Sequence, residues 1–268
     1  MNWLAAAFFL AKTYAVEGLV VAVRPAEQTI VVSHKEIPGV MPAMAMPVRV
    51  RDAREMRGLQ PGDSVQFQLV VEEGRGSARR LRVRKPENQI EQDRRVVPLE
   101  TPKEQVAVGA AFPDFALTAH DGEPWRLSDA RGSLVAVQFL YTRCPMPEVC
   151  PRLAATFSRV QKRFPQAALQ LVSITLDPQH DTPAVLARYA TYWRAQSGWS
   201  FLTGSVEEIR RVAARFGIVY WPEEGVITHT STLGFIDKQG RLAARVEGLN
   251  FTAQQVGDLV GKLLEEPK

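Results

Sequence analysis

Both cysteines of this chain, Cys144 and Cys150, lie in one short segment between a predicted buried strand and a predicted amphipathic helix. Residues 133–140 are apolar and rich in β-branched side chains, which indicates the strand. After the cysteines, apolar residues recur at helical spacing, and Pro151 suits the first turn of a helix. This order places Cys150 close to a helix N-terminus, where backbone N–H groups and the helix dipole favour a thiolate.

Two thiols in such a turn have three interpretations. They can exchange disulfides with another protein, bind a soft metal ion, or form a structural disulfide. The residue spacing alone leaves all three open.

The pattern of the 268 residues changes along the chain, and the length is sufficient for two domains. Short strands separated by turns fill residues 16–84, which predicts a small all-β barrel of the oligonucleotide/oligosaccharide-binding (OB) type. Residues 85–105 are polar and contain three prolines, as linkers do. From 106 to 268, strands alternate with helices, so we predict an α/β fold with a thioredoxin-like domain after the barrel.

The individual elements follow from periodicity and turn residues. In the first domain, strands are predicted over 18–23, 28–33, 46–51, 64–71 and 79–84. In the second, we predict strands over 133–140 and 169–175, hairpins over 115–127 and 232–246, and helices after Cys150 and over 183–193, 206–216 and 252–264.

Residues 1–15 resemble the end of a secretory signal peptide, with an apolar run over 3–11 and small residues before a cut after Ala15. A frayed first helix is the alternative, and the run is too short to span a membrane as a helix. Two cysteines confined to one motif suit an oxidising compartment. We therefore expect a periplasmic protein, or one associated with the membrane through its N-terminus and facing the periplasm.

Composition argues against a nucleic-acid partner. The net charge is only +4, and Lys and Arg are scattered. The densest basic run, residues 79–85, alternates with apolar residues and is explained by a solvated strand face.

Three of the six methionines fall within residues 41–46. Met44 and Met46 are two positions apart, so on a strand their thioethers share a face. Thioethers and the nearby imidazole of His34 form a soft ligand set suited to Cu(I). The alternative is that these methionines fill an irregular core.

The segment from His34 to Met41-Pro-Ala-Met44-Ala-Met46 resembles the copper loop of CusF-like periplasmic metallochaperones, and the resemblance covers about residues 16–85. It implies that His34, Met44 and Met46 bind Cu(I). Met41 stands where that family has a tryptophan that caps the ion, which makes Met41 a candidate fourth ligand.

Residues 107–266 resemble the Sco/SenC family of copper chaperones. The matching motifs are Gly109-Ala-Ala-Phe-Pro-Asp-Phe115, Phe139-Leu-Tyr-Thr-Arg-Cys144-Pro145, Glu148-Val-Cys150-Pro151, Leu176-Asp-Pro-Gln-His-Asp-Thr-Pro183 and His229-Thr-Ser231. The resemblance implies a copper site of Cys144, Cys150 and His229, and a role in assembling the CuA centre of cytochrome oxidase. Independently, two thiolates and one imidazole suit Cu(I) and can also hold Cu(II). We expect His229 to lie on a loop edge just before a strand that begins at Thr232.

Five residues lie between the cysteines, whereas the family loop has three. Met146 occupies the position of the family's first cysteine, so we consider it a candidate additional ligand.

His120 and His180 are predicted to be structural, with Asp181 or Thr182 capping the helix entered at Pro183.

Three possibilities for the function agree with these residues, and one of them is a copper sensor or binding module without transfer. The first is an exported copper metallochaperone that delivers copper to a cuproprotein such as the CuA subunit of cytochrome c oxidase. The second is a thiol–disulfide oxidoreductase that reduces acceptor cysteines before metallation, with Cys150 as the activated thiolate and Cys144 as its partner. A peroxidase has less support.

Overall fold

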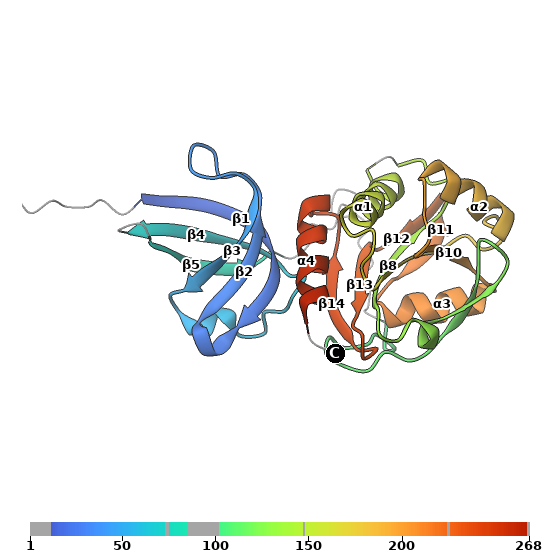
Figure 1. Ribbon diagram of the computed structural model, residues 1–268, viewed down its shortest axis with the longest axis horizontal. Helices are drawn as coiled ribbons and strands as arrows, with labels where there is room; N and C mark the ends of the chain where they lie inside the picture. Colours follow the sequence, from blue (N-terminus) through green and yellow to red (C-terminus); the bar gives the residue numbers. More distant parts are fainter. Residues whose placement is uncertain (1–11, 73–74, 85–101, 147, 224–225, 267–268) are drawn as a thin grey trace, which may run out of the picture. The chain divides into compact units, whose positions relative to one another are not determined.

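The computed structural model describes residues 12–72, 75–84, 102–146, 148–223 and 226–266. It divides into two compact units, residues 1–85 and 86–268 (Figure 1). Residues 1–11 of the predicted signal segment and 85–101 of the predicted linker lie outside the described residues.

The first unit is a five-stranded closed barrel with strand order β1-β2-β3-β5-β4. Its strands are β1 Lys12–Arg24, β2 Thr29–His34, β3 Met44–Val50, β4 Ser64–Glu72 and β5 Arg75–Val83, with short 3-10 helices η1 Pro25–Glu27 and η2 Ala53–Met56. The parallel pairing of β3 with β5 closes the barrel, and all other pairings are antiparallel. This architecture confirms the predicted OB-type barrel.

Strand β1 is long because it pairs with β2 on one side and with β4 on the other. At Gly18 an added Cβ would run into the Val32 side chain and lie 2.8 Å from the Ser33 carbonyl oxygen, so only glycine allows this approach. Residues 12–15, the last four of the predicted signal segment, lie in β1 and pair with residues 71–68 of β4.

The second unit is built on a seven-stranded mixed sheet of order β14-β13-β8-β9-β10-β6-β7. Its strands are β6 Ala116–Ala119, β7 Pro124–Arg126, β8 Leu134–Leu140, β9 Leu169–Thr175, β10 Trp199–Thr203, β13 Thr232–Ile236 and β14 Leu242–Glu247. The helices are η4 Leu127–Ala130, α1 Cys150–Arg163, α2 Pro183–Tyr192, α3 Val206–Arg215 and α4 Ala253–Glu265. A separate two-stranded sheet pairs β11 Tyr220–Glu223 with β12 Val226–His229.

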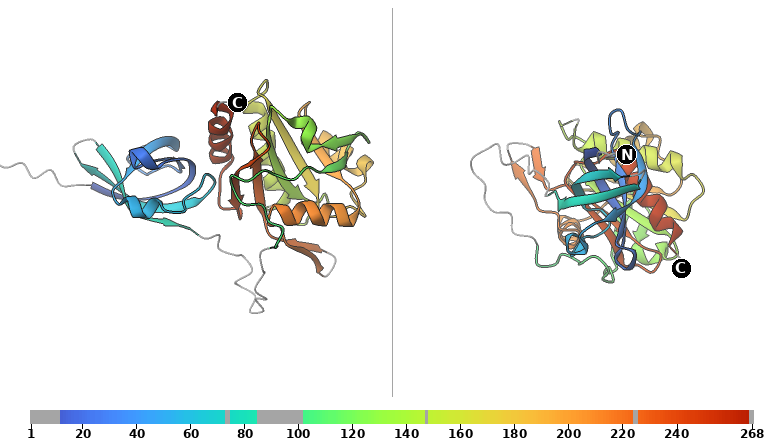
Figure 2. Two further views of the ribbon diagram at one scale, coloured as in Figure 1. Left: turned by 90° about the horizontal axis from the view of Figure 1, so that it is seen from below. Right: turned by 90° about the vertical axis from the view of Figure 1, so that its left-hand side faces the viewer.

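Helices cover both faces of the sheet (Figure 2). Helices α1 and α4 pack together on one face, whereas α3 buries Ile209, Val212 and Phe216 in the core on the other. The central strand β8 is buried along its whole length, as expected of a strand covered on both sides. The thioredoxin-like α/β prediction is confirmed.

Strand β10 and the β11–β12 hairpin are not predicted from the sequence. Strand β10 is only five residues long, and its Trp-Ser-Phe-Leu-Thr sequence carries too short an apolar run to be distinguished from a loop. Strand β11 contains Pro222, which weakens any strand pattern. The loop edge expected at His229 is therefore wrong, because His229 ends β12 and pairs with Tyr220.

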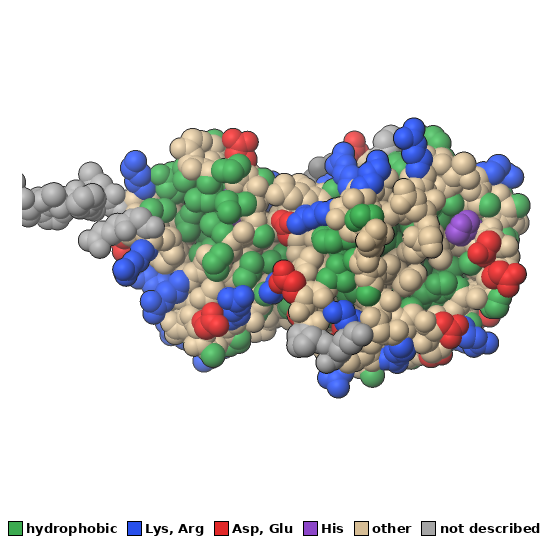
Figure 3. Space-filling model, in the orientation of Figure 1, with side chains coloured by type: hydrophobic (Ala, Val, Ile, Leu, Met, Phe, Trp, Pro, Cys, Tyr) green, Lys and Arg blue, Asp and Glu red, His purple; other side chains and the backbone are tan. Residues whose placement is uncertain are grey.

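No described helix is both long and apolar enough to cross a bilayer. On the face drawn in Figure 3, Lys and Arg side chains lie in several separate groups with acidic residues among them. This dispersed charge agrees with the scattered distribution of basic residues in the sequence.

Candidate metal-binding sites

The cysteine segment is anchored at its start by two buried carboxylates. Asp181, fully buried, accepts hydrogen bonds from the Thr142 amide at 3.0 Å, the Thr142 hydroxyl at 2.5 Å and the Thr175 hydroxyl at 2.6 Å. Arg143 donates to Asp177 with an Nε–Oδ2 distance of 2.7 Å. These bonds tie the residues before Cys144 to the segment between β9 and α2. Thr182, not Asp181, caps α2 by accepting from the Val185 amide.

Cys150 is the first residue of α1 and is fully buried, whereas Cys144 is half-buried in the preceding turn. Both are free thiols. The Sγ atom of Cys150 lies 3.9 Å from Nε2 of His229, which β12 brings to the start of α1. The Sγ atom of Cys144 lies 3.8 Å from the Met146 carbonyl oxygen.

The orientation of the His229 ring leaves one nitrogen available for a metal. Its Nδ1 is 2.9 Å from the Thr230 carbonyl oxygen. A carbonyl can only accept, so Nδ1 carries the proton and Nε2 presents a lone pair toward Cys150. Burial lowers the pKa of His229 and keeps the ring neutral, and the bond to Thr230 opposes this only in part. In metal sites, a hydrogen bond from the ring nitrogen that does not bind the metal commonly orients the histidine in this way.

The two thiols differ in acidity. A hydrogen bond from the Cys150 thiol lowers the pKa of Cys144 to about 6, against the opposing effect of burial. The pKa of Cys150 is raised, first by this hydrogen bond to Cys144 and then by burial. The sequence-based assignment of Cys150 as the activated thiolate is therefore wrong. The two sulfurs share one proton. The proton stays on Cys150, which is buried, although Cys150 is the first residue of a helix.

Within the described residues, no three side chains of His, Cys, Asp or Glu are already gathered at metal-binding geometry. The predicted ligands are instead linked in pairs, Cys144 with Cys150 and Cys150 with His229. Met146 is 43% exposed at the rim of this group. Thiolate, thiol and imidazole together fit a soft, thiophilic ion such as copper.

The barrel brings together the second predicted ligand set. His34 pairs with Met44 across β2 and β3, and Met46 pairs with Val32, so these side chains share one face of the ladder. His34 is buried with Nδ1 2.6 Å from the Lys35 carbonyl oxygen, while its buried Nε2 has no hydrogen-bond partner among the described residues. An unpaired buried imidazole nitrogen is costly unless it binds something, and thioether neighbours suit Cu(I).

The three methionines of this segment differ in environment. Met44 is 42% exposed, whereas Met41 and Met46 are half-buried and pack against the barrel core. Met41 also forms a backbone bridge with Ile37 that closes the loop before β3. Met44 therefore contributes little to the core, whereas Met41 and Met46 contribute to it.

The remaining histidines occupy structural or solvent-facing positions. His120 accepts a hydrogen bond from the Phe201 amide at Nδ1, and its ring packs edge-on against Phe201. His180 is exposed, and its amide donates to the Asp177 carbonyl.

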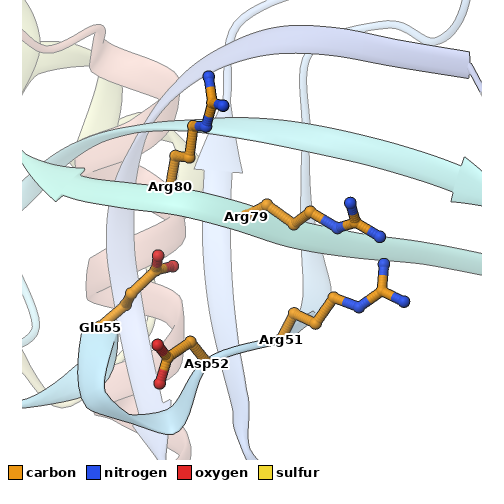
Figure 4. Close-up of a pocket in the computed structure, with 5 residues that line it drawn as sticks. All are labelled: Arg51, Asp52, Glu55, Arg79 and Arg80. Carbon is orange, nitrogen blue, oxygen red and sulfur yellow. The ribbon is translucent and has the colours of Figure 1, made fainter.

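A shallow pocket on the barrel is lined by Arg51, Asp52, Glu55, Arg79 and Arg80 (Figure 4). Arg51 and Arg79 both pair with Glu72, at 3.8 and 3.6 Å. Glu55 accepts from the Leu81 amide at 3.0 Å. None of these residues belongs to either sulfur-containing ligand set, and the ion pairs account for part of the basic run on β5.

Comparison with known proteins identifies both units. The SCO1/SenC family model matches residues 103–264. The chain belongs to the SCO1/SenC family. A second model, the copper binding periplasmic protein CusF, matches residues 13–82, so the barrel is a CusF-like domain.

Individual relatives agree with this assignment. A Stutzerimonas stutzeri protein named for copper binding is 30% identical over 162 residues, which cover 55% of this chain and 78% of that protein. The SCO2-like protein RT0576 of Rickettsia typhi is 29% identical over 148 residues, covering 52% and 70%. The SCO1/SenC family lipoprotein of Bacillus anthracis str. Ames has a TM-score of 0.53 and 26% identity, covering 59% of this chain and all of that one.

The fold is shared with BsSco, described as a member of the Sco family of cytochrome c oxidase assembly proteins, at a TM-score of 0.52 and 23% identity, covering 60% of this chain and 98% of that one. The family matches support copper as the cofactor of the chain.

Proposed function

We propose that this member of the SCO1/SenC family is an exported copper metallochaperone. In the thioredoxin-like unit, Cys144, Cys150 and His229 hold the copper, with Met146 as an additional donor. In the CusF-like unit, the donors are His34, Met44 and Met46, with Met41 beside them. The observation that carries the proposal is the 3.9 Å approach of Cys150 Sγ to an unprotonated His229 Nε2, next to a thiol whose pKa is about 6.

The two cysteines have different parts in this mechanism. Cys144 is half-exposed and ionised at neutral pH, so its thiolate offers the first point of attachment for incoming Cu(I). Cys150 must lose its proton to become a ligand, so binding releases one proton to solvent. Transfer to an acceptor with similar soft ligands needs only ligand exchange, and no acid–base residue is required.

The acceptor that we propose is a cuproprotein of the respiratory chain, the CuA-bearing subunit of cytochrome c oxidase. The link of the Sco family to cytochrome c oxidase assembly supports this choice.

We also propose the periplasm, or the membrane surface facing it, as the location, because the barrel matches a periplasmic copper protein and a Sco relative is a lipoprotein. Fusing two copper sites in one chain raises the effective concentration of one near the other.

A thiol–disulfide oxidoreductase is the second candidate, and the acidity of Cys144 favours it. In this reaction the Cys144 thiolate attacks an acceptor disulfide and forms a mixed disulfide. Cys150 then attacks Cys144, its proton passing to the released acceptor thiolate. The acceptor thiolate released in the first step takes its proton from solvent, so the acceptor disulfide becomes two thiols while Cys144 and Cys150 become a disulfide.

Copper titration of the full chain separates the two candidates. We expect one Cu(I) bound in each unit, measured by competition with a chromogenic Cu(I) chelator. Cys150→Ala should abolish the site of the second unit, and His34→Gln that of the barrel. If the chain binds no Cu(I) in the second unit and instead reduces protein disulfides in metal-free buffer, the oxidoreductase function is correct.

A further inference from the structure

Tyr141 connects the parts of the candidate copper site that come from different elements. It directly follows β8 and is 1% exposed. Its carbonyl accepts from the Cys144 amide at 3.3 Å, and its ring packs edge-on against His229 with centroids 6.3 Å apart. One residue thus contacts both the cysteine turn and the histidine.

The phenol hydroxyl contacts the strand that carries His229. The Ile227 amide, two residues before His229 on β12, donates to the Tyr141 oxygen at 3.3 Å. In this bond the phenol oxygen is the acceptor, so the hydroxyl ties the segment that follows β8 to the backbone of β12.

The bond to Ile227 matters because β11 and β12 form a sheet of their own. The seven-stranded sheet includes neither strand, so ladder hydrogen bonds to that sheet do not fix the position of His229. Contacts outside that ladder therefore place the hairpin, and the Tyr141 hydroxyl provides one to its backbone.

We propose that the Tyr141 hydroxyl is a positioning group that holds the β11–β12 hairpin against the cysteine turn, so that His229 and the two thiols reach the same copper ion. This inference rests on the proposed function of the second unit. Phenylalanine at this position would keep the ring packing against His229 but lose the bond to the Ile227 amide. A copper site assembled from three segments would then be less preorganised.

The test uses the full chain carrying His34→Gln, so that the measured Cu(I) affinity reports the second unit. Tyr141→Phe is compared with Tyr220→Phe, which removes a hydroxyl from the same hairpin, opposite His229, without touching the Tyr141 contacts. The readouts are Cu(I) affinity by chelator competition and amide hydrogen exchange at Ile227 in the metal-free protein.

We expect Tyr141→Phe to weaken Cu(I) binding about tenfold and to accelerate exchange at Ile227, because the Ile227 amide loses its acceptor in a part-buried place. Tyr220→Phe should change neither by more than about twofold. Should Tyr141→Phe not fold cooperatively, 3-fluorotyrosine at position 141 keeps the shape, makes the oxygen a weaker acceptor and should still accelerate exchange at Ile227.

Equal Cu(I) affinities in the parent and Tyr141→Phe would overturn this inference and leave the proposed function intact. Unchanged exchange at Ile227, in Tyr141→Phe or with fluorotyrosine, would also overturn it. A parent that binds no Cu(I) in the second unit would overturn the proposed function itself.

Discussion

The Sγ atom of Cys150 and the Nε2 atom of His229 lie 3.9 Å apart, although the two residues are 79 positions apart in the sequence. A bond from the other ring nitrogen to the Thr230 carbonyl fixes the tautomer in which Nε2 has a lone pair. Substitution of His229 by alanine should therefore lower Cu(I) affinity of the second unit by more than about 100-fold, since even outer-shell partners of metal ligands contribute 10- to 100-fold.

The matched control for His229→Ala is His180→Ala, because His180 is exposed and its bonds to Asp177 and Thr182 are made by its backbone, which alanine keeps. It should bind Cu(I) as the parent does. Equal losses in both variants, measured by chelator competition, would show that the imidazole of His229 has no specific role.

The acidity of Cys144 can be measured in the metal-free chain by alkylation. Its pKa is lowered to about 6, so the thiolate population and the alkylation rate should rise as pH increases through about 6 and level off above pH 7. In Cys150→Ala the stabilising hydrogen bond is lost, and the midpoint should move upward. A midpoint near pH 8.5 in the chain without substitutions would contradict the assignment of the lowered pKa to Cys144.

Asp181 should be important for stability. Alanine at this position leaves three donors, from Thr142 and Thr175, without their acceptor in a buried place. We expect the free energy of unfolding to fall by about 2–4 kcal/mol, measured by urea denaturation. Asp121→Ala is the control, because among the described residues Asp121 accepts a side-chain bond only from the Glu123 amide, in an exposed turn. Its cost should stay below about 1 kcal/mol.

Met44→Leu distinguishes a ligand from a core residue in the barrel. Met44 is 42% exposed, so leucine should change stability by less than about 0.5 kcal/mol. Loss of the thioether should nevertheless weaken Cu(I) binding by the barrel about tenfold. Met56→Leu, at a buried core position, should leave copper binding unchanged. Cu(I) is titrated into Cys150→Ala chains that also carry Met44→Leu or Met56→Leu, so that the barrel site is measured. Equal Cu(I) affinities of these two chains would favour the core interpretation of Met44.

The sequence predicted the two folds because their elements are strongly patterned. The β8 strand and the α1 helix around the cysteines follow directly from apolar runs, helical spacing and Pro151. The β11–β12 hairpin could not be predicted, because its strands are four residues long and one contains a proline. The position of His229 against α1 is a tertiary relationship that no local pattern contains.

The acidity of the thiols shows a second limit of sequence reasoning. A helix N-terminus favours a thiolate at Cys150, but this local effect is outweighed by complete burial and by the neighbouring Cys144. The importance of Tyr141 was missed for a similar reason. Its position beside the cysteine motif was visible, whereas its bond to Ile227 requires the folded chain.

Copper K-edge X-ray absorption of the full His34→Gln chain, loaded with one equivalent of Cu(I), tests the central claim most directly. We predict sulfur ligands from both cysteines and one imidazole nitrogen, with a sulfur lost in Cys150→Ala and the imidazole signal lost in His229→Ala. A spectrum that neither substitution changes would contradict the assignment of copper to this site.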